Sequence, residues 1–439
     1  MANSTIRPAS ILLPPLRSYD GEIRVPGSKS ITNRVFLISA LAEGTTRLHN
    51  LLRSDDTCYM GEALKQLGVK IQMSEDFTEA TVRGNGGPLN APENVNGECF
   101  ADLYLGNAGT AMRSLCAALT LGEGEFRLTG EDRMKERPIR DLVDALKTLG
   151  GDVRYCENVG YPPVYIMARG LKGGTVSVRG NISSQYLTAL LICAPYAESE
   201  MHIHVEGTLI SAPYILLTLD VMKRFGIEVR RDGFADFYVP KGVYKSPGDY
   251  MVESDASSAS YPLAAAAITG GKVRVLGVGS DCRQGDIAFT KVLEAMGAKI
   301  TMGPDWVECV GGPLKGVDMD LNDIPDAAMT VAPLALFAEG KTCIRGIASW
   351  KVKETDRIAA MASELRKLGA QVVAGEDFIE ITPPARPAEN VSIATYNDHR
   401  MAMCFSLVAL GGVAVNILDP SCVNKTYPRY FEDFLKLSK

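Results

Sequence analysis

The chain has 439 residues, of which 46% are hydrophobic and 22% charged, as is typical of a soluble protein with two or three domains. Its formal net charge of −6 argues against a nucleic-acid partner, so a site for anionic ligands must concentrate positive charge locally. The ten cysteines include no C-x-x-C pair, which favours reduced thiols in a cytoplasmic protein.

The sequence predicts neither a metal site nor a membrane span. His202 and His204 share one face of an expected strand, and two imidazoles alone are a poor ligand set. The longest apolar stretch, residues 401–418, is interrupted by Ser406 and by Gly411–Gly412. It therefore predicts a buried helix followed by a strand, not a transmembrane segment. The N-terminal residues lack the apolar core of a signal peptide.

The first stretch that suggests chemistry is residues 25–34. A proline and a glycine end a short apolar run there, and apolar residues then recur at helical spacing over residues 31–41. We therefore expect Lys29, Ser30 and Arg34 at the start of a helix, where unpaired N–H groups and the helix dipole attract anions. A polar helix cap with solvated charges explains the same residues equally well.

One pattern recurs five times along the chain: the end of an amphipathic helix, a glycine, and a strand. In the first copy, residues 64–67 end the helix, Gly68 follows, and residues 69–71 begin the strand. The other copies lie 71 to 82 residues apart and place the glycine at Gly150, Gly226, Gly297 and Gly369. Such a period indicates a structural unit of about 70–80 residues.

A sixth helix end, residues 431–437, follows at the same spacing, but no strands come after it. The segment before Pro26 is the expected donor of the missing strands. Six helix-and-strand units suggest an α/β protein with two similar domains of three units each. We expect one domain to consist of residues 1–26 plus 253–439, and the other to be an inserted domain of residues 27–252.

Further helix starts in the first half offer groups that bind anions. Residues 105–113 contain a Gly/Asn turn with Asn107 as the expected N-cap of the next helix. Residues 133–138 place three cations before another helix, although such charge runs are usually solvated. Hydroxyl groups and an amide occur at residues 183–185 and 211–214, where ordinary helix capping is the competing explanation.

The second half carries four polar stretches. Asp326 precedes an apolar helix, and an N-cap aspartate is the simplest explanation for it alone. Residues 353–357 form the most highly charged pentad of the chain, and residues 397–400 precede its most hydrophobic helix. Residues 419–428 follow the final expected strand.

Together and in this order, these stretches resemble a known family. The motifs are Pro26–Ser30, Leu105–Arg113, Arg133–Pro138, Ser183–Gln185, Pro325–Thr330, Lys353–Arg357, Asn397–Arg400 and Lys425–Thr426. They closely resemble those of the 5-enolpyruvylshikimate-3-phosphate synthases (3-phosphoshikimate 1-carboxyvinyltransferases) of the bacterial, glyphosate-sensitive type, over residues 8–436. The resemblance implies two similar domains that close on the ligands, each with three βαβαββ units around a pseudo-threefold axis, an inside-out α/β barrel.

The resemblance also implies a reaction. The enolpyruvyl group of phosphoenolpyruvate is transferred to the 5-hydroxyl of shikimate 3-phosphate, with release of phosphate, in the shikimate pathway that leads to chorismate and the aromatic amino acids. The family works by addition and elimination through a tetrahedral intermediate, without metal or organic cofactor. It further implies glyphosate as an inhibitor and a monomer as the functional form.

By the same resemblance, Asp326 is the base at the hydroxyl, and Lys29 and Glu354 transfer protons. The implied ligands of shikimate 3-phosphate are Lys29, Ser30, Arg34, Ser183, Ser184, Gln185, Ser211, Tyr214, Asp326, Ser349 and Lys353. The implied ligands of phosphoenolpyruvate are Lys29, Gly109, Arg133, Gln185, Arg357, Arg400 and Lys425. His399 is expected to contact the ligands or to orient its neighbours.

The chain departs from the family pattern in two places. Ser349 precedes Trp350 where an asparagine is usual, which shortens the reach toward shikimate 3-phosphate. Ser114 stands where this type usually has proline. The sister transferase acting on UDP-N-acetylglucosamine is disfavoured, because residues 131–138 lack its loop cysteine. A non-catalytic anion-binding protein is disfavoured because it has no need of Asp326 and Glu354 among so many cations.

Overall fold

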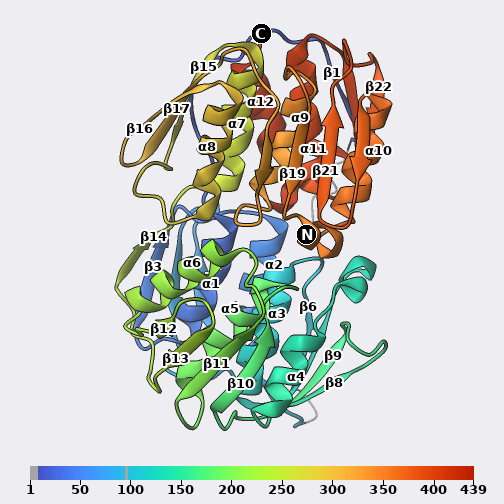
Figure 1. Cartoon of the computed structure of the whole chain (residues 1–439). Helices are drawn as coiled ribbons and strands as arrows, with labels where there is room; N and C mark the ends of the chain where they lie inside the picture. The colour runs from blue at the N-terminus through green and yellow to red at the C-terminus, as the bar shows by residue number, and fades with distance from the viewer. Residues whose placement is uncertain (1–7, 94–96) are drawn as a thin grey trace. The chain divides into compact units, whose positions relative to one another are not determined.

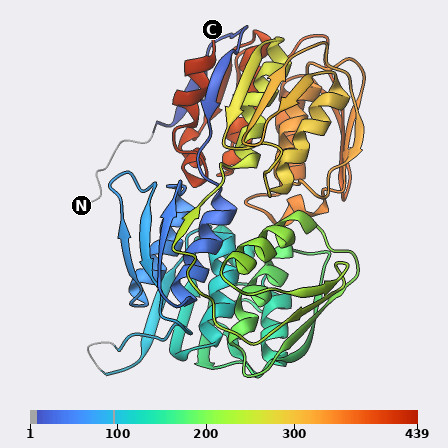
Figure 2. The ribbon, with the colours of Figure 1, turned by 90° about the vertical axis from the view of Figure 1, so that its left-hand side faces the viewer.

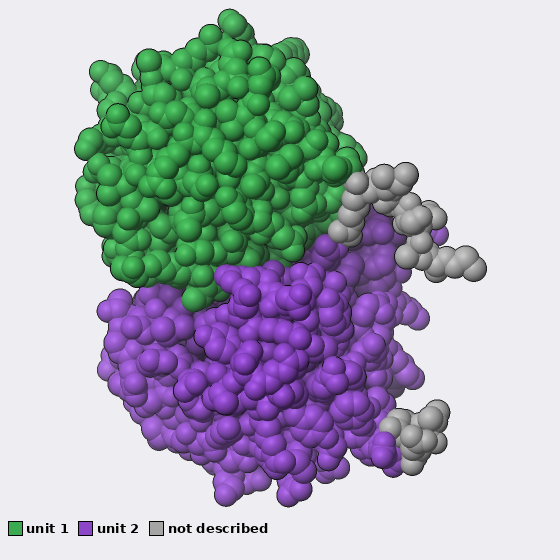
Figure 3. Space-filling view, turned by 90° about the vertical axis from the view of Figure 1, so that its right-hand side faces the viewer, with its two compact units in different colours: residues 1–26, 254–439 green, residues 27–253 purple. Residues whose placement is uncertain are grey.

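The computed structural model describes residues 8–93 and 97–439, so the first seven residues of the expected domain 1–26 lie outside the described part. The chain divides into two compact units, coloured separately in Figure 3. Unit 1 consists of residues 1–26 and 254–439, and unit 2 of residues 27–253. Each unit is described below by itself.

Unit 2 contains three four-stranded sheets, each built from one repeat of the chain. The first repeat comprises α1 (Lys29–Leu41), β3 (Thr45–His49), α2 (Asp55–Gln66), β4 (Lys70–Met73), β5 (Ala80–Arg83) and the distant β14 (Asp249–Met251). The second comprises β6 (Phe100–Tyr104), α3 (Gly109–Thr120), β7 (Glu123–Thr129), η1 (Asp132–Glu136), α4 (Arg140–Thr148), β8 (Asp152–Tyr155) and β9 (Val164–Arg169). The third comprises β10 (Gly174–Arg179), α5 (Ser184–Cys193), η2 (Ala194–Tyr196), β11 (Met201–Glu206), α6 (Ala212–Arg224), β12 (Arg230–Asp232) and β13 (Asp236–Val239).

Unit 1 repeats the same plan. Its first repeat comprises β2 (Gly21–Arg24), α7 (Ala256–Thr269), β15 (Lys272–Leu276), η3 (Gly285–Ala288), α8 (Phe289–Met296), β16 (Lys299–Met302) and β17 (Trp306–Val310). Its second comprises β18 (Asp318–Asp320), η4 (Ala327–Thr330), α9 (Val331–Ala335), β19 (Thr342–Arg345), η5 (Ala348–Val352), α10 (Arg357–Lys367), β20 (Gln371–Ala374) and β21 (Phe378–Thr382). Its third comprises β22 (Val391–Ile393), α11 (His399–Ser406), η6 (Leu407–Gly411), β23 (Val415–Leu418), η7 (Pro420–Lys425), α12 (Tyr430–Leu437) and β1 (Ser10–Leu13).

Five of the six sheets have four strands with the same pairing pattern, and the sixth has three strands among the described residues. In β10-β11-β13-β12, for example, β10 and β11 run parallel, and the remaining neighbours run antiparallel. Parallel strands need a crossover, which a helix supplies directly where the two strands are consecutive, as α5 does between β10 and β11. The predicted βαβαββ unit is therefore confirmed, including the buried helix followed by a strand over residues 401–418.

The incomplete third repeat of unit 1 takes a strand from the other end of the chain, as the sequence predicts. Strand β1 pairs antiparallel with β23, from Ser10 opposite Leu418 to Leu13 opposite Val415. Figure 2 shows this N-terminal segment beside the C-terminal helices of the same unit. Among the described residues this sheet has three strands, in the order β1-β23-β22.

Helices fill the middle of each unit, and the sheets lie around them (Figure 1). The first helix of each repeat is apolar and buried on nearly all sides, as in α3, where every residue except Thr110 is buried. The second helix is amphipathic, as in α4, which buries Leu142, Val143, Ala145 and Leu146. Strands such as β9 alternate buried and partly exposed residues, so one face of each sheet packs on the helices.

The glycine that ends the second helix of each of five repeats has a structural reason. Gly68, Gly150, Gly226, Gly297 and Gly369 all have φ between 84° and 110°. Only glycine adopts this left-handed conformation without a steric penalty from a Cβ atom, so it lets the chain leave the helix and begin the next strand. Within the described residues, no helix is both long and apolar enough to cross a membrane.

The pairing of β1 with β23 predicts that two neighbouring leucines of β1 contribute very differently to the stability of the protein. Leu13 is fully buried, whereas Leu12 next to it is 64% exposed. Leu13→Ala should lower the free energy of unfolding by about 2–4 kcal/mol, because it leaves a cavity in the core. Leu12→Ala is the matched control and should leave the urea midpoint nearly unchanged. Equal midpoints for the two variants would show that β1 is not part of the core of unit 1.

Candidate active site

The centre of the polar cluster in unit 1 is Arg357, the first residue of α10. Its guanidinium is almost completely buried and donates to three carboxylates, one from each of its nitrogen atoms. The Nη1 atom lies 2.9 Å from Oδ1 of Asp326, Nη2 lies 2.8 Å from Oε2 of Glu354, and Nε lies 2.8 Å from Oδ2 of Asp398. Charge-assisted bonds of this kind fix both partners, so Arg357 sets the positions of the two expected acid–base groups.

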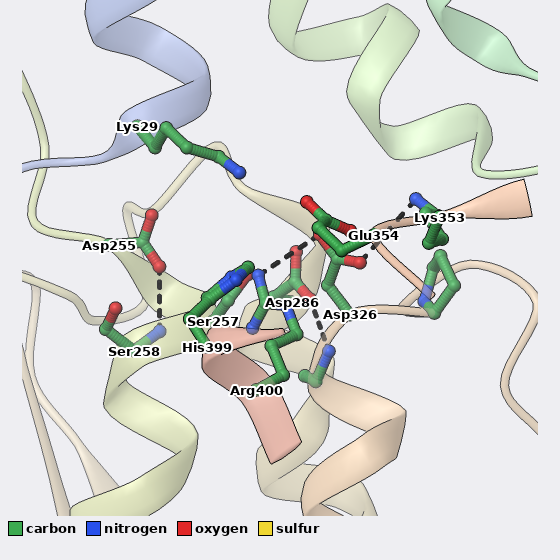
Figure 4. Close-up of polar contacts among 12 residues, drawn as sticks. Lys29, Asp255, Ser257, Ser258, Asp286, Asp326, Lys353, Glu354, His399 and Arg400 are labelled. Atoms are coloured by element: carbon green, nitrogen blue, oxygen red, sulfur yellow. Dashed lines mark hydrogen bonds and ion pairs between the residues drawn. The ribbon is translucent and has the colours of Figure 1, made fainter. Parts of the chain in front are cut away.

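Asp326 is surrounded by cations (Figure 4). Besides Arg357, Nη2 of Arg400 lies 3.1 Å from its Oδ2, and Nζ of Lys353 lies 3.6 Å from its Oδ1. Burial alone would raise the pKa of Asp326, but the charges of Arg400, Lys353 and Arg357 outweigh it and hold the pKa well below its usual range. Asp326 precedes η4 but forms no side-chain cap bond, so the simple N-cap explanation is wrong.

The backbone on both sides of Asp326 is also held. The buried indole of Trp350 donates from Nε1 to the carbonyl of Pro325 at 2.7 Å. The N–H of Ala327 donates to Oδ1 of the buried Asp286 at 3.0 Å, a contact drawn in Figure 4. Sequence reasoning missed both contacts, although Trp350 lies beside the most charged pentad of the chain.

The N-terminus of α11 contributes the second part of the cluster. Asp398 caps the helix by accepting from the N–H of Arg400 at 2.9 Å, and the same carboxylate binds Arg357. Arg400 also donates from Nη1 to the hydroxyl of Tyr261 at 3.2 Å, and burial raises the pKa of that hydroxyl. His399 is completely buried, with Nδ1 at 3.5 Å from Oδ1 of Asp398.

A carboxylate of α10 holds the turn before α11 in place. Tyr396 and Asn397 both have positive φ, near 55° and 52°, which costs free energy for residues other than glycine. The fully buried carboxylate of Glu364 accepts from the hydroxyl of Tyr396 at 2.7 Å and from the N–H of Ala394 at 3.1 Å. These bonds hold the turn that leads into Asp398.

Two further expected residues of unit 1, Lys425 and Ser349, lie outside the segments described so far. Lys425, at the end of η7, has its Nζ 3.9 Å from Oε1 of Glu354. Ser349 lies on η5 beside Trp350 and is partly buried. Its expected contact with shikimate 3-phosphate stays a prediction. Unit 1 thus brings together four cations and three carboxylates that the sequence distributes over a hundred residues.

In unit 2, the start of α1 holds Lys29 and Ser30. Ser28 caps the helix by accepting from the N–H of Ile31 at 3.5 Å. The ammonium group of Lys29 lies 3.5 Å from Oδ2 of Asp56, and both side chains are mostly buried. The helix start therefore offers a nearly buried cation together with backbone N–H groups, as the sequence suggests.

Arg34, by contrast, is used mainly inside unit 2. Its Nε donates to Oγ1 of Thr218 at 2.9 Å, and its Nη2 donates to Oγ1 of Thr188 and the carbonyl of Tyr214, both at 3.3 Å. Nη1 donates to the carbonyl of Ser30 at 2.9 Å. Burial lowers the pKa of Arg34 to about 10. Arg34 thus ties α1 to α5 and α6, and its expected contact with shikimate 3-phosphate stays a prediction.

The turn before α3 corrects one expectation. Asn107 is not the N-cap of this helix, which begins at Gly109 after Ala108 and has no side-chain cap. The reason is that both oxygens of Asn107, Oδ1 and the carbonyl, accept from Nη1 of Arg137 at 2.8 and 2.9 Å. The N-terminus of α3 is consequently left without a capping side chain.

Gly109 lies against the ends of two arginine side chains. A Cβ atom at this position would lie 2.8 Å from Nη1 of Arg113 and would collide with the guanidinium of Arg137. Arg133, on η1, lies 2.8 Å from Oε2 of Glu136, but both side chains are partly exposed, so this ion pair is weak and can exchange for a ligand anion.

The start of α5 lies next to that of α3. Ser183 caps α5 by accepting from the N–H of Gln185 at 3.2 Å, and Ser184 is its first residue. The amide of Gln185 donates from Nε2 to Oγ1 of Thr110 at 3.4 Å. Ser211 precedes α6 with a left-handed φ of 55° and forms no cap bond with its hydroxyl, and Tyr214 follows in the first turn.

Comparisons with known proteins identify the family of this chain. A family model described as EPSP synthase (3-phosphoshikimate 1-carboxyvinyltransferase) matches residues 15–434. The chain belongs to the EPSP synthase family. The resemblance noted in the sequence is therefore confirmed, and the polar clusters of the two units belong to an EPSP synthase scaffold.

Individual relatives support the family at full length. The 3-phosphoshikimate 1-carboxyvinyltransferase of Sulfurovum sp. (strain NBC37-1) is 58% identical, over 96% of this chain and 98% of its own length. That of Serratia proteamaculans (strain 568) is 56% identical, over 98% and 99%. The solved EPSP synthase from Acinetobacter baumannii matches with a TM-score of 0.79 and 28% identity, covering 98% of this chain and 97% of that one. The enolpyruvyl transferase NikO from Streptomyces tendae, at 19% identity and a TM-score of 0.79 over 98% of both chains, shares the fold.

The cations around Asp326 predict a pH-dependent contribution to stability. Because the pKa of Asp326 in the folded chain lies well below 3.8, its charge stabilises the fold fully at neutral pH, and this contribution is lost as the pH falls below about 4. Asp326→Asn should therefore lower the unfolding midpoint in urea at pH 7, with the gap to wild type narrowing as the pH falls below 3.8. A gap that stays constant over this range would contradict the assignment.

Proposed function

We propose that this chain catalyses the reaction of its family, transfer of the enolpyruvyl group of phosphoenolpyruvate to the 5-hydroxyl of shikimate 3-phosphate with release of phosphate. The observation that carries the proposal is the cluster of unit 1, in which Asp326 and Glu354 are held by Arg357. Two acid–base carboxylates, each paired with cations that anionic substrates can recruit, suit a proton-transfer reaction between two phosphorylated molecules.

The reaction has two stages, and protons balance in each. In the addition, the 5-hydroxyl oxygen bonds to C2 of phosphoenolpyruvate, its proton goes to Asp326, and the CH₂ carbon takes a proton to become CH₃. In the elimination, that CH₃ group gives a proton back and its C–H electrons form the new double bond, the bond from C2 to the phosphate oxygen breaks, and phosphate leaves with the proton that Asp326 had accepted. Glu354 and Lys29 transfer the proton at carbon in the two directions, as acid and then as base.

The proposed binding residues form two overlapping sets, one for each ligand. Phosphoenolpyruvate is bound by Lys29, Gly109, Arg133, Gln185, Arg357, Arg400 and Lys425. Shikimate 3-phosphate is bound by Lys29, Ser30, Arg34, Ser183, Ser184, Gln185, Ser211, Tyr214, Asp326, Ser349 and Lys353. Inhibition by glyphosate and a cytoplasmic monomer are further expectations that rest on the family resemblance.

The first test is phosphate release by the purified chain with phosphoenolpyruvate and each of two acceptors. Shikimate 3-phosphate should support turnover, and UDP-N-acetylglucosamine should not. Glu354→Gln keeps the side-chain shape and an acceptor oxygen for Arg357 but removes the transferable proton, so it should lower kcat on the order of 10²–10⁴-fold with little change in KM.

The control for Glu354→Gln is Glu376→Gln, which alters a carboxylate that is almost fully exposed and paired with Lys351. It should leave kcat unchanged. Near-complete turnover by Glu354→Gln would refute the proton-transfer role, and no turnover of wild type with shikimate 3-phosphate would refute the proposed function itself.

Ser114 generates a prediction about inhibition by glyphosate. It is a buried residue in α3, five positions after Gly109, the first residue of the helix. In an α-helix its N–H bonds to the carbonyl of Thr110, and proline cannot make that bond and crowds the preceding turn. Serine therefore leaves the helix start at Gly109 in a different position from that in a proline-containing relative, and the longer inhibitor should be more sensitive to this difference than phosphoenolpyruvate.

We expect Ser114→Pro to be inhibited several-fold more tightly by glyphosate than wild type, with KM for phosphoenolpyruvate little changed. Ser114→Ala retains the N–H and is the matched control, expected to behave as wild type. Competitive inhibition constants measured for the three proteins in one buffer check the prediction. Equal constants for Ser114→Pro and wild type would show that neighbouring side chains absorb the change.

A further inference from the structure

Glu364 is a completely buried carboxylate of α10 to which the proposed reaction assigns no role. Both of its oxygens accept from Nζ of Lys367, at 2.9 and 2.7 Å, and this ion pair compensates its charge. Each oxygen also accepts from a group outside the helix: Oε1 from the hydroxyl of Tyr396 at 2.7 Å, and Oε2 from the N–H of Ala394 at 3.1 Å. The ion pair within α10 does not depend on these two bonds, so they need an explanation of their own.

The two bonds hold a turn that has an unfavourable backbone conformation. The turn comprises residues 395–398 and is closed by the N–H of Asp398, which donates to the carbonyl of Thr395 at 2.9 Å. Its central residues, Tyr396 and Asn397, both have positive φ, as in a type I′ turn, where glycine, asparagine and aspartate are the usual residues. The Cβ atom of a tyrosine makes this conformation costly in free energy, and the bond from its hydroxyl to Glu364 offsets that cost.

The turn leads directly into residues of the candidate site. Asp398 accepts from Nε of Arg357 at 2.8 Å, and it caps α11 by accepting from the N–H of Arg400 at 2.9 Å. The guanidinium of Arg400 in turn lies 3.1 Å from the carboxylate of Asp326. A change in the turn would therefore displace Asp398, and with it the partners of both arginines.

Helix α10 thus holds the start of α11 at two points. Arg357 and Glu364 are seven residues apart, which is about two helical turns, so both lie on the same face of α10. Arg357 binds Asp398, and Glu364 binds the turn that precedes it. With both bonds in place, Asp398 cannot rotate about its contact with Arg357 without breaking the contact of Tyr396 with Glu364.

We propose that Glu364 is a positioning residue for the transfer reaction, which acts through the turn of residues 395–398 to fix Asp398 and Arg400. The inference rests on the proposed function, because it explains how two of the proposed ligands of phosphoenolpyruvate, Arg357 and Arg400, keep their geometry. A purely structural role of Glu364 would lower the stability of its variants but leave the kinetic constants of the folded protein unchanged.

Tyr396→Phe removes only the hydroxyl that binds Glu364. The side chain of Tyr396 is 42% exposed, so this variant should fold normally. Its kcat/KM for phosphoenolpyruvate should fall about 5- to 50-fold, the effect of losing a hydrogen bond to a charged group. KM for shikimate 3-phosphate should change by less than about twofold, because Ser349 and Lys353 do not lie on this turn. Glu364→Gln should show the same kinetic pattern with a larger loss of stability.

Tyr165→Phe is the matched control. The hydroxyl of Tyr165, on β9 of unit 2, also donates to a carboxylate, that of Glu125. The variant makes the same chemical change on a strand that carries none of the proposed binding residues. It should leave the kinetic constants for both substrates unchanged.

Tyr396→Gly separates the loss of positioning from the loss of packing. It removes more of the side chain than Tyr396→Phe does, but glycine adopts a positive φ without a steric penalty. If Glu364 holds a strained turn, Tyr396→Gly should be more active than Tyr396→Phe, and adding Glu364→Gln to it should cause little further loss. If the side chain of Tyr396 only packs against its neighbours, Tyr396→Gly should be the less active variant.

Amide hydrogen exchange at Asp398 and Arg400 measures the turn without turnover, because their N–H groups close the turn and form the helix cap. Faster exchange in Tyr396→Phe and Glu364→Gln, together with lower kcat/KM, supports the inference. Unchanged kinetic constants in both variants overturn it, as does a Tyr396→Gly variant less active than Tyr396→Phe. A wild-type protein without turnover, with faster exchange in both variants, would refute the proposed function and leave the hold of Glu364 on the turn intact.

Discussion

A single buried guanidinium organises the site of unit 1. Arg357 cannot release its charge, so its position at the start of α10 is tolerable only because Asp326, Glu354 and Asp398 surround it. These carboxylates come from separate segments, and each is placed by this shared partner. Lys353 and Arg400 lie near Asp326, and Lys425 lies near Glu354. In unit 2, Lys29 pairs with Asp56, and the partly exposed Arg133 pairs with Glu136. The anionic ligands of the proposed reaction must therefore compete with carboxylates of the protein for these cations.

The fold could be predicted from the sequence to an unusual extent, because its signals are local and repeated. The glycine that follows the second helix in five repeats has a left-handed conformation, which residues with a Cβ atom rarely adopt. Its five copies therefore reveal the repeat directly. The pairing of β1 with the last repeat could also be predicted, because no strands follow the last helix of the chain and the N-terminal segment is the expected donor. Strand pairing itself could not be read from such signals. The register of Leu13 against Val415 depends on packing between segments four hundred residues apart.

The site was harder to predict for a physical reason. Residue types indicate which groups can bind an anion, but not which internal partner claims them first. Arg34 lies near the start of a helix, where an arginine that binds an anion is expected, yet its N–H groups donate to Thr188 and Thr218 inside unit 2. Asn107 has the position of a helix cap, yet Arg137 takes its oxygens. Asp286 and Trp350 hold the backbone around Asp326 from distant segments, and nothing in their local sequence shows it. Long-range contacts of single side chains leave no periodic pattern, so only the structure could show them.

The same pairing imposes an order on catalysis. Burial raises the pKa of Asp326, while Arg400, Lys353 and Arg357 lower it further than burial raises it, so the carboxylate is a weak base while it is paired with these cations. In the proposed reaction, the phosphate and carboxylate groups of the ligands attract those same cations. Each cation that turns toward a ligand oxygen weakens its hold on Asp326, and the effect of burial then dominates. The base consequently gains strength only when anionic ligands occupy the site, at the moment when the 5-hydroxyl proton must be removed. Asp286 and Trp350 keep the backbone of Asp326 in place during this exchange, so its carboxylate changes partners without losing its position.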